Sequence, residues 1–142
     1  MQEKIFLALM GAYHAHFAAS RKQFAKLDLT EGQPKILYFL HHGCEGALQK
    51  ELAQYVGITP ATLTSVLDKM TAKGYIRKEE TRVSGGKRGF RIFLSEEGAV
   101  AARKVDSMIE ELEEKAMKGF TEEERKSVLA LLTRLENNLS ED

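Results

Sequence analysis

The residues with the most evident chemistry lie between Thr81 and Ser95, where basic side chains alternate with glycines and no acidic residue occurs. Guanidinium and ammonium groups bind phosphate oxygens, and glycine lets a backbone approach a ligand closely. The stretch is therefore a candidate for contact with nucleic acid, although a solvated glycine-rich hairpin is the competing interpretation when it is taken alone. The basic residues are Arg82, Lys87, Arg88 and Arg91, and the glycines are Gly85, Gly86 and Gly89.

The histidines and the single cysteine are the candidate metal-binding and redox residues. His14 and His16 are two positions apart and point to different sides of a helix, and the chain beyond His42 contains no further histidine. We therefore interpret His14, His16, His41 and His42 as surface or interface residues and expect neither a metal site nor a cofactor. Because Cys44 is the single cysteine, the chain cannot form an internal disulfide. We expect Cys44 to be an unspecialised thiol rather than a redox switch.

Composition limits the classes of function. The 142 residues carry 21 basic and 21 acidic side chains, and no apolar run reaches the ~18 residues that a membrane span needs. We expect a cytoplasmic protein without a membrane partner. No acid–base or nucleophile constellation converges in the sequence, and Gly85 and Gly86 lack the strand–loop–helix context of a phosphate-binding loop, so we expect no enzyme.

The charge is unevenly distributed along the neutral chain. Eight basic and three acidic residues lie between Pro60 and Arg91, whereas five basic and eleven acidic residues lie between Asp106 and Asp142. A basic middle and an acidic C-terminal third indicate one face for nucleic acid and another that is turned away from it.

Two short helices are expected just before the basic stretch. Residues 48–56 have amphipathic spacing and end at Gly57, and Thr59 can cap a second helix with Pro60 at its first position. Two short helices joined by a glycine-containing turn form a helix-turn-helix. The outer face of the second helix carries short polar groups that can approach base edges and phosphates. These residues are Ala61, Thr62, Thr64, Ser65, Asp68 and Lys69.

Two strands are expected around the glycines of the basic stretch, Tyr75–Ile76 before them and Arg91–Leu94 after them. A hairpin rich in glycine and arginine, directly after a recognition helix, is typical of a winged helix. Arg88 at its tip could enter the electronegative minor groove. The preceding helix-turn-helix favours this interpretation over the solvated hairpin.

Further amphipathic helices are expected on both sides of this winged helix. Residues 3–26 are apolar on two faces, and a capping box at Thr30–Gln33 begins a helix that stops at Gly43. Ser95 and Thr121 can cap two C-terminal helices with apolar stripes. We thus predict a mainly α fold, in which a winged helix-turn-helix domain of residues 30–97 joins a helical dimerisation bundle of residues 1–29 and 98–142.

In this arrangement the chain resembles the MarR family of bacterial transcriptional regulators. The resemblance is carried by the stretches LTEGQPKILYFL, ELAQYVGITPATLTSVLDKMTAKGYIRKE, KRGFRIFLSEEG and FTEEERKSVLALLTRL. It implies a homodimer that binds a pseudo-palindromic operator in double-stranded DNA, usually as a repressor released by a small ligand or by oxidation. It assigns DNA contact to Thr59, Pro60, Ala61, Thr62, Thr64, Ser65, Lys69, Lys87 and Arg88.

The wing departs from the family pattern at one position. The family usually has Asp-x-Arg where this chain has Gly86, Lys87 and Arg88, so the arginine lacks the carboxylate that would orient it. We expect a more mobile wing, and a stronger non-specific attraction to phosphate, from that loss.

Two alternatives remain open at this point. Tyr13, Phe17, Tyr38 and His41 could line a pocket for a small aromatic effector, although core packing explains them equally well. A winged helix can also serve as a protein-interaction module without specific DNA binding. The salt dependence of DNA affinity distinguishes that alternative from an operator-binding regulator.

Overall fold

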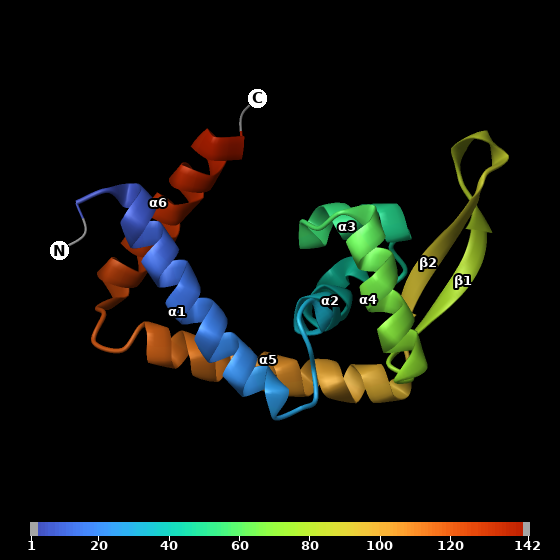
Figure 1. The fold of residues 1–142 in the computed structure, drawn as a ribbon, viewed down its shortest axis with the longest axis horizontal. Helices are drawn as coiled ribbons and strands as arrows, with labels where there is room; N and C mark the ends of the chain where they lie inside the picture. Colours follow the sequence, from blue (N-terminus) through green and yellow to red (C-terminus); the bar gives the residue numbers. More distant parts are fainter. Residues whose placement is uncertain (1–2, 141–142) are drawn as a thin grey trace. The chain divides into compact units, whose positions relative to one another are not determined.

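The computed structural model describes residues 3–140 and is mainly helical with one β-hairpin (Figure 1). This confirms the predicted fold class. Its elements are α1 (Ile5–Ala25), α2 (Gln33–Phe39), the π-turn η1 (Leu40–Cys44), α3 (Gln49–Val56), α4 (Pro60–Ala72), β1 (Ile76–Arg82), the 3-10 turn η2 (Ser84–Gly86), β2 (Arg88–Leu94), α5 (Glu96–Ala116) and α6 (Glu122–Ser140). The chain divides into two compact units, Met1–Ile109 and Glu110–Asp142. Among residues 3–140, no helix is both long and apolar enough to cross a membrane.

Local capping chemistry explains where several helices begin. The Thr59 hydroxyl accepts a hydrogen bond from the Thr62 amide at 3.2 Å and caps α4. At α6 the capping box is complete, because the Thr121 hydroxyl accepts from the Glu124 amide at 3.1 Å while the Glu124 carboxylate accepts from the Thr121 amide at 2.8 Å. Both helix starts were predicted from the sequence, and both are confirmed.

The capping box predicted before α2 is only half formed. The Gln33 side-chain oxygen accepts from the Thr30 amide at 3.2 Å, but the N-cap is Gly32, with a φ of 90°, and no side-chain hydroxyl caps the helix. Gln33 is buried, and its oxygen also accepts from the Lys73 ammonium at 3.2 Å. The glutamine thus ties the start of α2 to the end of α4 as well as holding the local turn.

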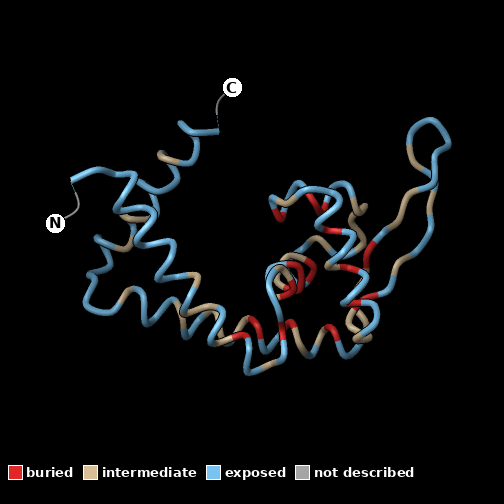
Figure 2. The backbone as a smooth tube through the Cα atoms, viewed as in Figure 1, coloured by how far each residue is buried: buried red, intermediate tan, exposed pale blue. Residues whose placement is uncertain are grey.

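The buried core lies within the winged-helix elements of the first unit (Figure 2). Apolar side chains from α2, η1, α3, α4, β2 and the first half of α5 are excluded from solvent there. The largest of them are Ile36, Leu37, Leu40, Leu52, Leu63, Leu67, Met70, Ile92, Val56 and Val105. The sequence stripes predicted on the two helices of the helix-turn-helix therefore face this core.

A close backbone contact attaches the start of α5 to the start of the hairpin. The Ser95 hydroxyl accepts from the Gly98 amide at 3.0 Å and donates to the Gly74 carbonyl. A Cβ atom at Gly98 would lie 1.9 Å from the Tyr75 carbonyl oxygen, so only glycine fits at this position.

The hairpin strands are longer than the predicted Tyr75–Ile76 and Arg91–Leu94. They pair antiparallel from Ile76 opposite Leu94 to Arg82 opposite Arg88. The prediction missed the outer part because those residues are mostly polar and exposed, and such strands lack a clear buried–exposed alternation.

The other edge of β2 is also occupied. The Gly46 amide donates to the Ile92 carbonyl at 2.8 Å, and the Ile92 amide donates to the Ala47 carbonyl at 3.0 Å. The segment before α3 therefore holds the base of the hairpin through two backbone hydrogen bonds, and the wing extends beyond this base.

Candidate nucleic-acid interface

The N-terminal half of α4 presents an exposed polar surface that hydrogen bonds hold in place. The Thr59 hydroxyl donates to the Thr62 hydroxyl at 2.9 Å. The Thr64 hydroxyl donates to the Pro60 carbonyl at 3.0 Å and accepts from the Gln49 side chain of α3 at 2.9 Å. The bond from Gln49 positions Thr64 of α4 relative to α3, and the other bonds hold the first turn of α4.

The same face of α4 is positive on balance. Ala61, Ser65 and Lys69 are exposed, and among residues 3–140 no hydrogen bond or ion pair engages the Lys69 ammonium. Asp68 lies 3.6 Å from the Lys78 ammonium of β1, which offsets its negative charge. A short, polar surface of this kind can approach both base edges and phosphates.

The tip of the wing is a tight turn with two left-handed residues. The Val83 amide donates to the Lys87 carbonyl, and the Gly86 amide donates to the Val83 carbonyl, each at 2.9 Å. Gly85 and Gly86 have φ values of 80° and 73°, a region that glycine adopts at little cost. The Arg82 guanidinium donates to the Gly86 carbonyl at 3.3 Å and closes the turn from the side.

Arg88 has an acidic partner that the sequence pattern did not reveal. Its Nε atom lies 3.7 Å from a carboxylate oxygen of Glu80, and its guanidinium lies 5.5 Å from the centroid of the Phe90 ring. Glu80 is directly opposite Phe90 in the strand register, so Arg88 and Glu80 are diagonal neighbours on one face of the hairpin.

This contact changes the expectation drawn from Gly86. The missing aspartate of the family pattern does not leave the arginine without a carboxylate, since β1 supplies one from across the hairpin. Lys87 is exposed, and no side-chain contact holds it in the part of the chain that the structure describes. The register of the hairpin would have revealed the pairing, but the predicted strands were too short to include either residue.

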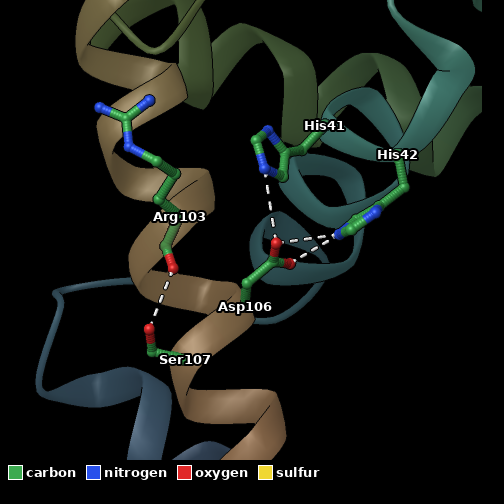
Figure 3. Close-up of polar contacts among 5 residues, drawn as sticks. All are labelled: His41, His42, Arg103, Asp106 and Ser107. Carbon is green, nitrogen blue, oxygen red and sulfur yellow. Dashed lines mark hydrogen bonds and ion pairs between the residues drawn. The ribbon is translucent and has the colours of Figure 1, made fainter.

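A second polar cluster lies away from the wing, between η1 and α5 (Figure 3). His42 Nε2 is 2.8 Å and 3.0 Å from the two carboxylate oxygens of Asp106, and His41 Nε2 is 3.4 Å from one of them. The sequence pattern singled out both histidines but not Asp106, because the carboxylate is 64 residues further along the chain.

The structure brings together only two of the four residues considered for an aromatic effector. The rings of Tyr13 and Phe17 stack within α1, with their centroids 6.0 Å apart, whereas Tyr38 and His41 each contact the ring of His42. Among residues 3–140, no ring contact joins Tyr13 or Phe17 to Tyr38 or His41. An open cavity of about 330 Å³ is lined instead by Leu27, Tyr75, Glu97, Val100, Ala101 and Lys104.

Comparison with known proteins identifies relatives of both the sequence and the fold. A sequence model of the MarR family matches residues 27–88. Over 123 residues the chain is 29% identical to YybA, an uncharacterized HTH-type transcriptional regulator of Bacillus subtilis (strain 168). That alignment covers 87% of this chain and 80% of YybA.

Two similar structures were solved with DNA. The S. aureus MepR–DNA complex superposes with a TM-score of 0.84 at 20% identity, covering 96% of this chain and 99% of MepR. A Listeria monocytogenes protein complexed with a 26mer DNA also has a TM-score of 0.84, at 22% identity, covering 97% and 90% of the two chains. These likenesses establish a shared fold over nearly the whole chain.

Proposed function

The chain belongs to the MarR family through its residues 27–88, and we propose that it regulates transcription by binding double-stranded DNA at a specific operator. The observation that carries the proposal is the pair of exposed surfaces, the polar face of α4 and the basic wing, on one winged-helix core. MarR-family proteins are transcriptional regulators, so the chain is not an enzyme. Because a protein that binds an operator must be in the same compartment as the DNA, we propose that the protein is located in the cytoplasm.

The two surfaces suit different grooves. A helix such as α4 enters the major groove with its first residues, while an arginine at a hairpin tip fits the narrow minor groove. Thr64 already uses its hydroxyl for two protein hydrogen bonds, so its methyl group is what it offers to a thymine methyl. The proposed DNA-contacting residues are Thr59, Pro60, Ala61, Thr62, Thr64, Ser65, Lys69, Lys87 and Arg88.

We propose that the protein acts as a homodimer through α1 and α6. Ile5 and Phe6 of α1 are 62% and 69% exposed, and Leu129 and Leu139 of α6 are 60% and 75% exposed. Exposed apolar side chains that recur along each of the two helices in this way indicate an interaction surface. A dimer with two copies of α4 about 34–36 Å apart would contact successive turns of the same DNA face.

From the family resemblance we also propose that the protein is a repressor and that a small aromatic ligand releases it from the operator. Tyr13, Phe17, Tyr38 and His41 are the residues proposed to contact that ligand. Aromatic acids should then raise the thermal midpoint of the protein and weaken its operator affinity. If neither quantity changes across a series of aromatic acids, the effector proposal fails.

DNA binding can be tested without knowing the operator. We would select bound duplexes from a random library and measure the affinity of the selected sequence at several salt concentrations. An operator-binding regulator should prefer the selected duplex over scrambled DNA and lose affinity steeply as salt rises, because bound phosphates release counterions. Weak binding to every duplex at every salt concentration would instead favour the protein-interaction module.

A further inference from the structure

We propose that His41, His42 and Asp106 bind a divalent transition-metal ion of the zinc type. The three side chains offer one ligand atom each, and these atoms all lie within 4.8 Å of one another. Figure 3 shows both imidazoles directed at the same carboxylate. The site lies within the first compact unit and shares no residue with the proposed DNA-contacting set. It shares His41 with the residues proposed for the aromatic effector, so metal and effector would compete for that imidazole.

An interruption of the helix makes this convergence possible. Consecutive side chains on a regular α-helix do not face the same point. Here the π-turn η1 follows α2, and the backbone leaves helical geometry at His42, with a φ of −107° and a ψ of 48°, and at Gly43, with a φ of 103°. Both Nε2 atoms thereby reach Asp106 on α5.

The distances from the two imidazoles to the carboxylate are close to those of a coordination site, and the three ligand atoms lie within 4.8 Å of one another. Ligand atoms placed tetrahedrally at about 2.0–2.1 Å from Zn²⁺ are roughly 3.3 Å from one another. The 3.4 Å separation between His41 Nε2 and Asp106 already matches this value. The 2.8 Å contact between His42 Nε2 and Asp106 is a direct hydrogen bond, and it would open by about 0.5 Å to admit the ion.

The donor set favours zinc over magnesium or calcium. Imidazole nitrogen suits Zn²⁺ and its neighbours in the first transition row, whereas Mg²⁺ and Ca²⁺ prefer oxygen ligands alone. Two histidines and one carboxylate leave the fourth tetrahedral position to water. The three side chains are partly exposed, at 31% for His41, 45% for His42 and 28% for Asp106, so an ion has access from solvent.

The surrounding residues support binding without competing for the carboxylate. The Tyr38 ring lies 4.4 Å from the His42 ring, and the two imidazoles are 5.0 Å apart and edge-on to each other. Arg103 lies on the same helix as Asp106, but its guanidinium points away from the carboxylate (Figure 3). The positive charge of the arginine therefore does not neutralise the acid directly.

Binding the ion replaces a hydrogen bond with coordination bonds. Without metal, His42 donates its Nε2 proton to Asp106, and the ion needs the lone pair of that same nitrogen. A neutral His42 must shift the proton to Nδ1, and a protonated one must release a proton to solvent. The carboxylate then accepts the metal ion in place of the proton.

The site would also connect the metal to the wing, a consequence that rests on the proposed function. Directly after η1, the Glu45 carboxylate accepts from the Leu94 amide at 3.0 Å and the Gly46 amide donates to Ile92 of β2 at 2.8 Å. Fixing η1 to α5 through an ion would therefore fix the segment that supports the base of the wing. We expect operator affinity to respond to Zn²⁺.

Metal titration of the untagged, chelator-treated full chain tests the site independently of DNA. We expect one Co²⁺ per chain with the visible absorption of a tetrahedral complex, displaced by Zn²⁺ but not by Mg²⁺. Asp106→Asn and His42→Ala should each weaken Zn²⁺ binding by about tenfold or more, measured by competition with a chromophoric chelator. His14→Ala, an exposed histidine on α1 outside the cluster, is the matched control and should bind as the wild type does.

Circular dichroism would verify that each variant is folded, and Asp106→Asn preserves the shape of the side chain. Equal Zn²⁺ affinity in the wild type and Asp106→Asn would overturn the site, as would an equal loss in His14→Ala. If the protein binds Zn²⁺ but its operator affinity is the same with and without Zn²⁺, the connection between the metal site and the wing would be overturned. Absence of operator binding under all conditions would count against the proposed function, while the metal titration would stand as measured.

Discussion

The winged-helix region and the terminal helices treat their apolar side chains in opposite ways. Leu63, Leu67 and Met70 of α4 are fully buried within the chain. Phe6 of α1 is 69% exposed, and Leu139 of α6 is 75% exposed. The first region completes its hydrophobic core alone, and the second leaves it open.

The contrast assigns different sources of stability to the two regions. Burial of apolar surface within one chain stabilises a fold at any protein concentration. Apolar surface that is covered only by another molecule contributes a free energy that depends on the concentration of that partner. The four predictions that follow test this division, beginning with the largest expected effect.

Substitution of glycine should have opposite effects in the two regions. A Cβ atom at residue 98 would lie 1.9 Å from the Tyr75 carbonyl oxygen, whereas one at Gly11 of α1 would meet nothing within 4 Å. We expect Gly98→Ala to lower the free energy of unfolding by about 3 kcal/mol, because the first turn of α5 must move away from the hairpin. Gly11→Ala should raise it by up to about 1 kcal/mol, as alanine is the better helix former.

Urea unfolding followed by circular dichroism measures both changes. The two substitutions add the same methyl group, so they differ only in its surroundings. If Gly98→Ala is as stable as Gly11→Ala, the close packing at the base of the wing is not what holds α5 in place.

Much of the local structure could be predicted because its causes are local. The cap at Thr59, the left-handed Gly57 that ends α3 and the capping box at Thr121 each depend on residues within one turn of a helix. The length of the hairpin could not be predicted in the same way. Residues 77–82 are polar and largely exposed, so pairing with β2 determines their conformation rather than any pattern of their own.

The candidate sites were harder to predict from the sequence, because they depend on contacts between distant parts of the chain. The basic residues of the wing are obvious in the sequence, but the Glu80 partner of Arg88 depends on the strand register. Asp106 joins His41 and His42 only because the helix is interrupted at η1 and α5 passes nearby. Residue type alone indicates one partner of each contact, such as Arg88 or the histidines. The other partner can be identified only when the fold is known, because it lies far away in the sequence.

The second prediction concerns the open face of α6. Replacing both Leu132 and Leu135 with glutamate should weaken dimerisation by about 100-fold or more, since each leucine contributes about 1.5–3 kcal/mol when it is buried at an interface. Operator affinity should fall with it, because two linked recognition helices bind more tightly than one. Sedimentation velocity over a range of concentrations measures the dimerisation constant.

Lys126→Glu is the matched control, since it makes the same change of two units in net charge on the same helix without removing apolar surface. It should remain dimeric. A persistent dimer in the double leucine variant would move the interface away from this part of α6, and the contrast between the two regions would then rest on α1 alone.

The third prediction tests the wing within the self-contained region. Arg88→Ala should weaken operator binding by about tenfold at ~0.1 M salt, with little change in stability, because the arginine is exposed and lies at the tip of the hairpin. Arg77→Ala removes the same charge from the base of the same hairpin, where the guanidinium lies 4.5 Å from the Phe93 ring. It should change affinity by less than about twofold, the effect of a distant, screened charge. Fluorescence anisotropy with the selected duplex compares the two, and equal losses would remove the special role of Arg88.

The fourth prediction, with the smallest expected effect, concerns Glu80. It tests whether this carboxylate orients Arg88 or acts only through its negative charge. An exposed ion pair is worth about 0–1 kcal/mol, so Glu80→Gln should leave the unfolding free energy nearly unchanged. It removes a negative charge near the proposed path of the phosphates, which should raise affinity for scrambled DNA by about twofold to threefold. If Glu80 also orients Arg88, specific affinity should rise less than non-specific affinity, and the ratio of the two should fall. A ratio that stays constant would mean that Glu80 acts only through its charge, and that the wing needs no carboxylate to position its arginine.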